Sequence, residues 1–247
     1  MTKPIISMKN IVKKFGDQTV LNHVDFDIAQ GKIIGLIGPS GAGKSTIIKI
    51  ILGMEKTQEG TATVFGQVMP NRKLLNRIGY MAQTDALYDA LSARENLMFY
   101  ADMKGVDPKD AKEQIEHITK VVDLVDDLDK RVSGYSGGMK RRLSLAIALL
   151  GDGEVLILDE PTVGIDPALR RKIWDELHSL RDDGKTILVT THVMEEAELV
   201  DDVALILGGK LIAYDTPANL KAKYNEDTVE NVFLKAEDQN EKNMGNR

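Results

Sequence analysis

The stretch GPSGAGKST, Gly38 to Thr46, constrains this chain more than any other. It fits the phosphate-binding pattern GxxxxGK[ST] and directly follows the apolar run KIIGLI, which predicts a buried strand. Glycines let the backbone turn so that successive N–H groups point at one anion, and the isoleucine-rich run after Lys44 indicates a helix whose positive end faces the same point. The stretch therefore predicts a site for nucleotide phosphates, formed by Gly38, Pro39, Ser40, Gly41, Ala42, Gly43, Lys44, Ser45 and Thr46.

Composition excludes several other kinds of protein. The chain has 247 residues and no cysteine, which rules out disulfides, thiolate catalysis and cysteine-ligated metals. The longest apolar runs are far shorter than the ~20 residues needed to cross a bilayer, so a membrane role requires a partner. No cleavable N-terminal targeting sequence is evident, so we do not expect secretion. The net charge of −6 argues against a general nucleic-acid binder.

The order of apolar patterns predicts the architecture. Short β-rich stretches such as IISMKNIVKKF and VLNHVDFDI come first, and helical spacing dominates from residue 86 to 150. The chain then alternates between strand and helix in VLILD, ALRRKIWDELHSL, TILVT, EEAELV and VALIL. Such alternation predicts parallel strands joined by crossover helices. We expect one domain overall, with an α/β core over 1–85 and 151–220 and an inserted helical subdomain over 86–150.

The C-terminal segment 221–247 reads as a short tail. It carries an apolar patch from Val229 to Leu234, and a polar run from Ala236 to Arg247 follows. A polar run of this kind buries too little apolar surface to offset the entropy lost on ordering. We therefore expect that end to be unordered.

The stretch VLILDEP predicts a strand that ends in two adjacent carboxylates, Asp159 and Glu160. Parallel sheets bind ligands at the carboxyl ends of their strands, and neighbouring acids repel unless a cation or separate tasks hold them apart. Asp159 can bind Mg²⁺ together with the Ser45 hydroxyl, and Glu160 can accept a hydrogen bond from an attacking water. The alternative is a pair of carboxylates that caps a helix.

A second glycine-containing helix start lies in YSGGMKRRLSLAIALL, residues 135–150. Ser136, Gly137 and Gly138 precede a strongly periodic helix, which makes a second anion-binding terminus. Alone, this pattern is typical of a capping turn. Between the phosphate loop and VLILDEP it resembles the LSGGQ signature of ATP-binding cassette proteins, and the order of motifs agrees with that family from about Ile5 to Leu220.

The resemblance assigns further residues by position. Gln83, which closes RIGYMAQ, is similar to the glutamine that reaches toward Mg²⁺ and water, and a solvated loop glutamine is the alternative. His192, after TILVTT, resembles the histidine that contacts the γ-phosphate; a satisfied buried or capping histidine is the alternative. Asp166 in PTVGIDP matches the aspartate that crosses to the partner subunit. Phe15 matches the aromatic residue that stacks on adenine, with a core phenylalanine as the competing interpretation.

The family resemblance also implies an assembly. Two subunits, either two copies or a copy and a paralogous ATPase, pack head to tail so that each signature faces the other chain's phosphate loop. The implied fold is a P-loop NTPase α/β core with an N-terminal antiparallel β subdomain and an inserted helical subdomain. The implied activity is hydrolysis of ATP with Mg²⁺, at the cytoplasmic side of a membrane and coupled to a separate transmembrane permease. SGGMKRRL, PTVGIDP and TVENVFL look most like the ATPase subunits of ABC-2 type drug and sodium exporters.

Some features depart from the signature or leave alternatives open. Tyr135 and Met139 stand where the family commonly has leucine and glutamine. The basic run Lys140, Arg141 and Arg142 lies where the helix dipole disfavours cations, so it either attracts the shared phosphates or faces solvent. Alternative functions are a soluble cassette ATPase in translation or DNA repair and a nucleotide-dependent switch. One cassette without sustained heptads argues against the first, and Glu160 argues against the second.

Overall fold

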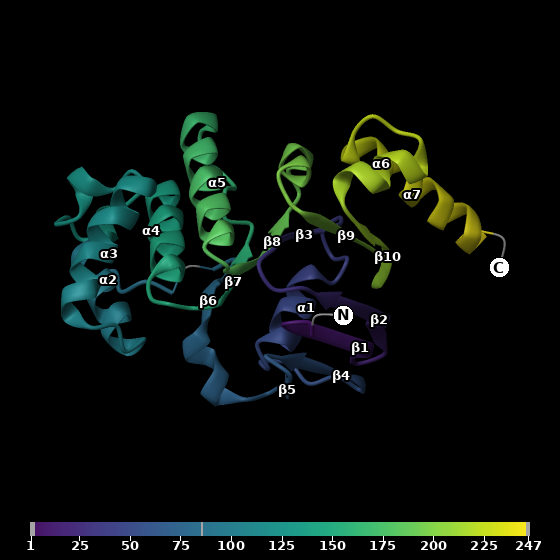
Figure 1. Cartoon of the computed structure of the whole chain (residues 1–247), viewed down its shortest axis with the longest axis horizontal. Helices are drawn as coiled ribbons and strands as arrows, with labels where there is room; N and C mark the ends of the chain where they lie inside the picture. Colours follow the sequence, from purple (N-terminus) through teal and green to yellow (C-terminus); the bar gives the residue numbers. More distant parts are fainter. Residues whose placement is uncertain (1–2, 85, 246–247) are drawn as a thin grey trace. The chain divides into compact units, whose positions relative to one another are not determined.

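The computed structural model of the chain describes residues 3–84 and 86–245 (Figure 1). The chain forms two compact units, one made of Met1–Arg72 and Leu188–Arg247 and the other of Lys73–Ile187. The boundary between the units falls within strand β8, Thr186–Thr191.

The first unit contains an antiparallel sheet in the strand order β2-β1-β4-β5. In β2 the buried residues Val24, Phe26 and Ile28 alternate with the exposed Asp25 and Asp27, as expected of a strand with one face in the core. This sheet confirms the predicted N-terminal antiparallel β subdomain. Its strands are β1 Ile6–Phe15, β2 Gln18–Ile28, β4 Glu59–Val64 and β5 Gln67–Val68.

A second sheet in this unit positions the phosphate loop. Strand β3, Ile33–Ile37, pairs in parallel with β9, Asp202–Leu207, which in turn pairs antiparallel with β10, Lys210–Asp215. Every residue of β3 and β9 is buried, which is typical of strands covered on both faces. Helix α1, Lys44–Ile51, follows β3 and buries four isoleucines, so the loop between β3 and α1 is held at both ends.

The C-terminal part of this unit differs from expectation. The sequence EEAELV was predicted to be an α-helix, but the structure has the short 3₁₀ helix η4, Met194–Glu198. The polar end was expected to be unordered, but α7 runs over Val229–Gly245 and packs with α6, Pro217–Tyr224, and η4 (Figure 1). Four residues of α7 are buried at helical spacing, namely Val229, Val232, Phe233 and Ala236. Because these docked turns nucleate the helix, the polar residues that follow extend it at little cost.

The second unit is mainly helical and extends on both sides of the segment 86–150. Strand β6, Ile78–Met81, pairs in parallel with β7, Val155–Asp159. The helices of this unit are α2 Ala93–Met103, α3 Pro108–Val121, α4 Gly137–Leu149 and α5 Pro167–Asp182, and its 3₁₀ turns are η1 Arg72–Arg77, η2 Val125–Asp127 and η3 Val132–Gly134. Among the described residues, no helix is long and apolar enough to cross a bilayer.

Candidate nucleotide site

Glycines shape the phosphate loop because it has no room for side chains at two positions. A Cβ on Gly38 would lie 2.2 Å from the carbonyl oxygen of Ile206, and a Cβ on Gly43 would lie 2.6 Å from Cδ2 of Leu21. Gly43 also has a φ of 105°, in the left-handed region that glycine adopts readily. As the N-cap of α1 it supplies no capping side chain, which is the condition under which a bound anion satisfies the first N–H groups of a helix. The loop therefore fits a phosphate group.

Lys44 begins helix α1 and turns back into the loop. Its side chain is buried, and Nζ donates to the carbonyl oxygens of Gly38 at 2.6 Å and Pro39 at 3.1 Å. These bonds keep a positive charge inside the loop. Ser45, the next residue on the helix, is half-buried.

Two more predicted residues belong to the same unit. Phe15 ends β1 with 47% of its surface exposed, so the competing interpretation as a core phenylalanine is wrong. Lys13 Nζ lies 4.6 Å from the centroid of the Phe15 ring. His192 follows β8, the strand that neighbours β3 in the sheet, and it is exposed rather than buried. The Thr191 hydroxyl donates to Glu196 at 2.6 Å and accepts from the Val193 N–H at 2.9 Å, which fixes the backbone on both sides of His192.

The two acids lie at the end of β7 in the second unit. Asp159 is buried at 4% exposure, and Glu160 is half-buried. Glu160 has a φ of 54°, which is uncommon for a residue with a side chain and often marks a functional position. The helix that follows, α5, is capped by Asp166. The alternative in which Asp159 and Glu160 cap a helix is therefore wrong.

The signature residues start helix α4. Ser136 is the N-cap, and its Oγ accepts a hydrogen bond from the Met139 N–H at 3.2 Å. Gly137 and Gly138 are exposed, and a Cβ on Gly137 would meet no atom within 4 Å. Tyr135 is buried, and its hydroxyl donates to the Asp127 carbonyl at 2.7 Å. Burial, with the nearby Asp127 carboxylate, raises the pKa of Tyr135 to about 12, so this residue is a neutral anchor for the loop.

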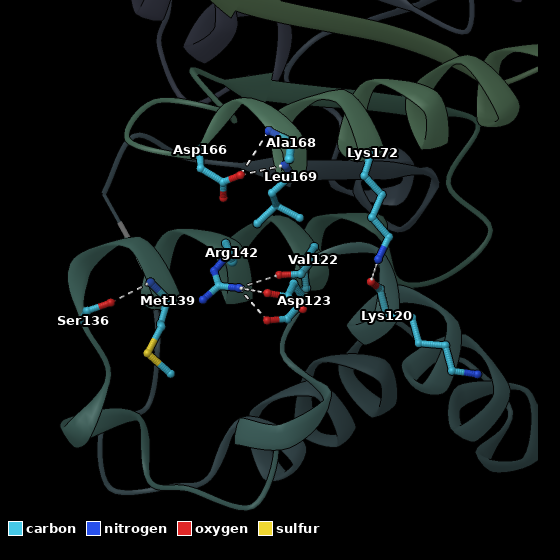
Figure 2. A network of polar contacts seen from close by, with 10 residues as sticks. All are labelled: Lys120, Val122, Asp123, Ser136, Met139, Arg142, Asp166, Ala168, Leu169 and Lys172. Carbon is cyan, nitrogen blue, oxygen red and sulfur yellow. Dashed lines mark hydrogen bonds and ion pairs between the residues drawn. The ribbon is translucent and has the colours of Figure 1, made fainter.

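Figure 2 shows that α4 and α5 carry the signature and Asp166 side by side. Asp166 Oδ1 accepts from the N–H groups of Ala168 at 3.1 Å and Leu169 at 3.0 Å. Arg142 Nη1 donates to the carbonyl oxygens of Val122, at 3.0 Å, and of Asp123. Arg142 thus ties the signature helix to the end of α3. Within this chain, Asp166 therefore caps helix α5.

A cavity of about 380 Å³ brings together residues from three predicted motifs. Gln83 follows β6 and is exposed, while Glu160 and the signature glycines come from the two other motifs. The lining residues are Gln83, Gly137, Gly138, Arg141, Glu160, Val163 and Gly164. Among the described residues, no group of three or more acidic, histidine or cysteine side chains is arranged to hold a metal ion.

Comparison with known proteins agrees with this geometry. The ABC transporter family profile matches residues 21–163, more than half of the chain. The chain belongs to the ABC transporter family. It is 44% identical over 215 residues to the Nod factor export ATP-binding protein I of Rhizobium meliloti, which covers 86% of this chain and 64% of that protein. It is 38% identical over 237 residues to the probable multidrug ABC transporter ATP-binding protein YbhF of Escherichia coli strain K12, covering 93% of this chain and 41% of that protein.

The fold is that of solved ATP-binding cassettes. The cassette MJ0796, solved as a dimer in a post-hydrolysis state with ADP and Pi, aligns with a TM-score of 0.77 and 26% identity over 85% of this chain and 98% of that one. The chain therefore has the fold of an ATP-binding cassette. It spans less than two thirds of the length of the Rhizobium meliloti relative.

The sequence reasoning missed the role of the basic run. All three residues are half-buried; Lys140 Nζ pairs with the exposed Asp89 at 2.7 Å, whereas Arg141 and Arg142 donate to backbone carbonyls. A solvated face does not describe those two arginines, and their attraction to the shared phosphates stays a prediction. No signal in the sequence identifies which carbonyl groups an arginine will reach across tertiary structure.

Proposed function

We propose that this cassette is the ATP-hydrolysing subunit of a membrane exporter and that it works as a head-to-tail dimer with two shared ATP sites. The observation that carries the dimer is the open space at the signature glycines. The relatives named above are a Nod factor export ATP-binding protein and a probable multidrug ABC transporter ATP-binding protein, and the solved cassette MJ0796 is dimeric. These relatives support export and dimerisation as properties to be tested in this chain.

The fold itself does not require glycine at the signature. A Cβ on Gly137 would meet no atom within 4 Å, and one on Gly138 would lie 4.0 Å from its nearest neighbours, the Gly164 carbonyl oxygen and Ser136 Oγ. Neither residue has the positive φ that would call for glycine. Glycine in a helix costs stability relative to alanine, so two unneeded glycines indicate that something outside the chain approaches this backbone. We infer that a phosphate held by the partner's loop makes that approach.

The phosphate loop supplies the first half of each site. The backbone N–H groups of residues 40–46 bind the β- and γ-phosphates, and Lys44 moves from its loop carbonyls to the phosphate oxygens. Phe15 stacks on adenine, for which its exposed ring is suited. Ser136, Gly137 and Gly138 of the other chain complete the site, and Asp166 lies at that interface.

The donor set fits Mg²⁺. Ser45 offers a hydroxyl, Gln83 an amide oxygen and Asp159 a carboxylate, which are the oxygen ligands that Mg²⁺ prefers. When bound, Mg²⁺ neutralises charge that develops on the phosphates. Glu160 accepts a hydrogen bond from the attacking water, and His192 contacts the γ-phosphate. Removing the Glu160 charge therefore slows chemistry more than it weakens ATP binding.

The membrane partner requires an apolar docking surface, and the second unit has one around Tyr88. Tyr88, Met98, Phe99 and Met103 are all exposed, and the rings of Tyr88 and Phe99 pack edge to face with centroids 4.9 Å apart. Leu87 and Leu91, close to Tyr88 in the sequence, are half-buried, and Asp85 lies outside the described residues. We propose that this surface receives a short segment of the permease at the cytoplasmic face of the membrane.

The proposed function is tested first at Lys44. Lys44→Ala removes the cation that contacts the phosphates and should abolish ATP turnover in a folded protein. Lys49→Ala is the matched control, because Lys49 lies on the same helix and is exposed. Steady-state phosphate release measures both variants. If Lys44→Ala hydrolyses ATP as fast as the control, the proposed phosphate site is wrong.

A further inference from the structure

Arg141 connects three segments of the second unit through one guanidinium. It extends from α4, and Nη1 donates to the carbonyl oxygens of Ala82 and Gln83, at 2.9 Å each. Nη2 donates to the carbonyl oxygen of Glu160 at 2.8 Å and to that of Asp159. The signature helix is thereby joined to the backbone that carries Gln83 and to the backbone at the end of β7.

The two neighbouring basic residues on α4, Lys140 and Arg142, contact other partners. Lys140 pairs with Asp89. Figure 2 shows that Arg142 donates to the carbonyl oxygens of Val122 and Asp123, which follow α3. Three consecutive basic residues therefore have three different tasks. These four hydrogen bonds of Arg141 go to main-chain oxygens, so they bear on where the Gln83 and Glu160 side chains start.

The backbone conformation of Glu160 explains why the hydrogen bond from Arg141 to its carbonyl matters. Its φ of 54° lies in the left-handed region, which residues with a side chain occupy only when their surroundings hold them there. The Glu160 carbonyl accepts from Arg141 Nη2, and the Val163 N–H approaches the same oxygen at 3.4 Å. A charged donor that is half-buried is well suited to hold this strained peptide.

We propose that Arg141 is a positioning residue that carries the position of the signature helix to Gln83, a proposed Mg²⁺ ligand, and to Glu160, which acts on the attacking water. When a nucleotide on the partner subunit draws the signature helix in, the same helix moves the backbone of Gln83 and Glu160 through Arg141. Hydrolysis is then tied to closure of the dimer. This inference rests on the proposed roles of Gln83 and Glu160.

The test separates turnover from ATP binding. Arg141→Gln should lower kcat by about tenfold or more, because small misplacements of catalytic groups have effects of that size, while the Kd for ATP stays within about twofold. Lys172→Gln is the control, since Lys172 of α5 also donates to a backbone carbonyl, that of Lys120, away from these segments. An unchanged kcat for folded Arg141→Gln, or a loss equal to that of Lys172→Gln, would overturn the proposal.

A double-mutant comparison separates this proposal from the assigned role of Glu160. Single-turnover rates are measured for Arg141→Gln, Glu160→Gln and the double variant. If Arg141 acts through Gln83 and Glu160, the loss of rate in the double variant is smaller than the product of the two single losses. If the two losses multiply, Arg141 acts by another route and the inference fails. If Glu160→Gln alone keeps the full rate, the assigned role of Glu160 fails, and with it the proposed route.

A second variant and a second readout cover the case in which Arg141→Gln does not fold. Arg141→Lys keeps the charge but offers one nitrogen, which cannot reach both backbone segments as a guanidinium does. Hydrogen exchange of Arg141→Lys should be faster in segments 82–84 and 160–164 and unchanged in segment 38–46. Exchange equal to wild type in both of the first two segments would show that Arg141 does not hold them.

Discussion

Gly138→Ala should stabilise the fold while damaging the shared site. The added methyl would lie 4.0 Å from its nearest atoms, so the folded chain accommodates it without strain. Replacing glycine by alanine at a compatible position stabilises by about 0.4 to 1 kcal/mol, chiefly because the unfolded chain loses conformational freedom. For a chain of this size such a gain raises Tm by roughly 1 to 4 °C.

The same methyl should hinder approach of the partner's phosphates. ATP-dependent dimerisation should weaken and turnover should fall, by roughly tenfold if the reacting groups are misplaced by a fraction of an ångström. The assays are thermal melting, size-exclusion chromatography with ATP, and phosphate release. Gly134→Ala is the control, because a Cβ there also meets no atom within 4 Å and η3 lies outside the proposed site. A lower Tm, or normal dimerisation and turnover, would refute the reasoning.

Two further predictions concern the surface of the second unit and the C-terminal helix. Tyr88→Glu should reduce export and cysteine crosslinking to the permease but leave ATP binding intact. Val125→Glu, at another exposed apolar residue of that unit, should change neither export nor crosslinking. Equal effects of the two substitutions would place the docking surface elsewhere. Burial raises the pKa of Glu198, but the hydrogen bonds from Lys221 and the Val229 N–H together lower the pKa by more than burial raises it. The pKa of Glu198 in the folded protein therefore lies below its ordinary value of 4.5. Its contribution to stability is therefore complete above about pH 4.5 and is lost as the pH falls through the folded pKa. The Tm difference between wild type and Glu198→Gln should accordingly shrink between pH 7 and pH 4, and a constant difference would contradict this assignment.

Much of the fold could be predicted because its signals are local. The apolar run before the phosphate loop is β3, and the residue pattern of VLILD is β7, both fully buried. The SGG pattern also predicted a helix start, and α4 begins there at Gly137, with Ser136 as its N-cap. Periodicity and capping chemistry act over a few residues, so a sequence reveals them directly.

The C-terminal helix shows where interpretation of the pattern failed. The residues Val229, Val232, Phe233 and Ala236 have the spacing of one helical face, so the signal for α7 was present. The polar residues that follow led to the wrong expectation of an unordered end, although a docked helix extends readily through polar residues. The predicted α-helix over the six residues EEAELV was wrong for another reason. A stretch this short forms a helix only with tertiary support, and here the buried Glu196 instead accepts from Thr191.

The tertiary links of the candidate site had no sequence signal. The left-handed φ of Glu160 is not encoded by residue type, because glycine and asparagine are the usual residues there. The carbonyl partners of Arg141 come from residues 18 to 59 positions away in the chain. Contacts of that kind depend on how helices and strands pack, which periodicity does not specify.

The most direct test of the account is ATP-dependent dimerisation of Glu160→Gln. This change keeps the shape of the side chain but removes the charge that polarises water, so both halves of the site still bind ATP while chemistry slows. Size-exclusion chromatography should show a dimer with ATP and a monomer without it. Adding Gly138→Asp, which places a carboxylate against the partner's γ-phosphate, should abolish that dimer. A double variant that dimerises as well as Glu160→Gln would contradict a site shared between two chains.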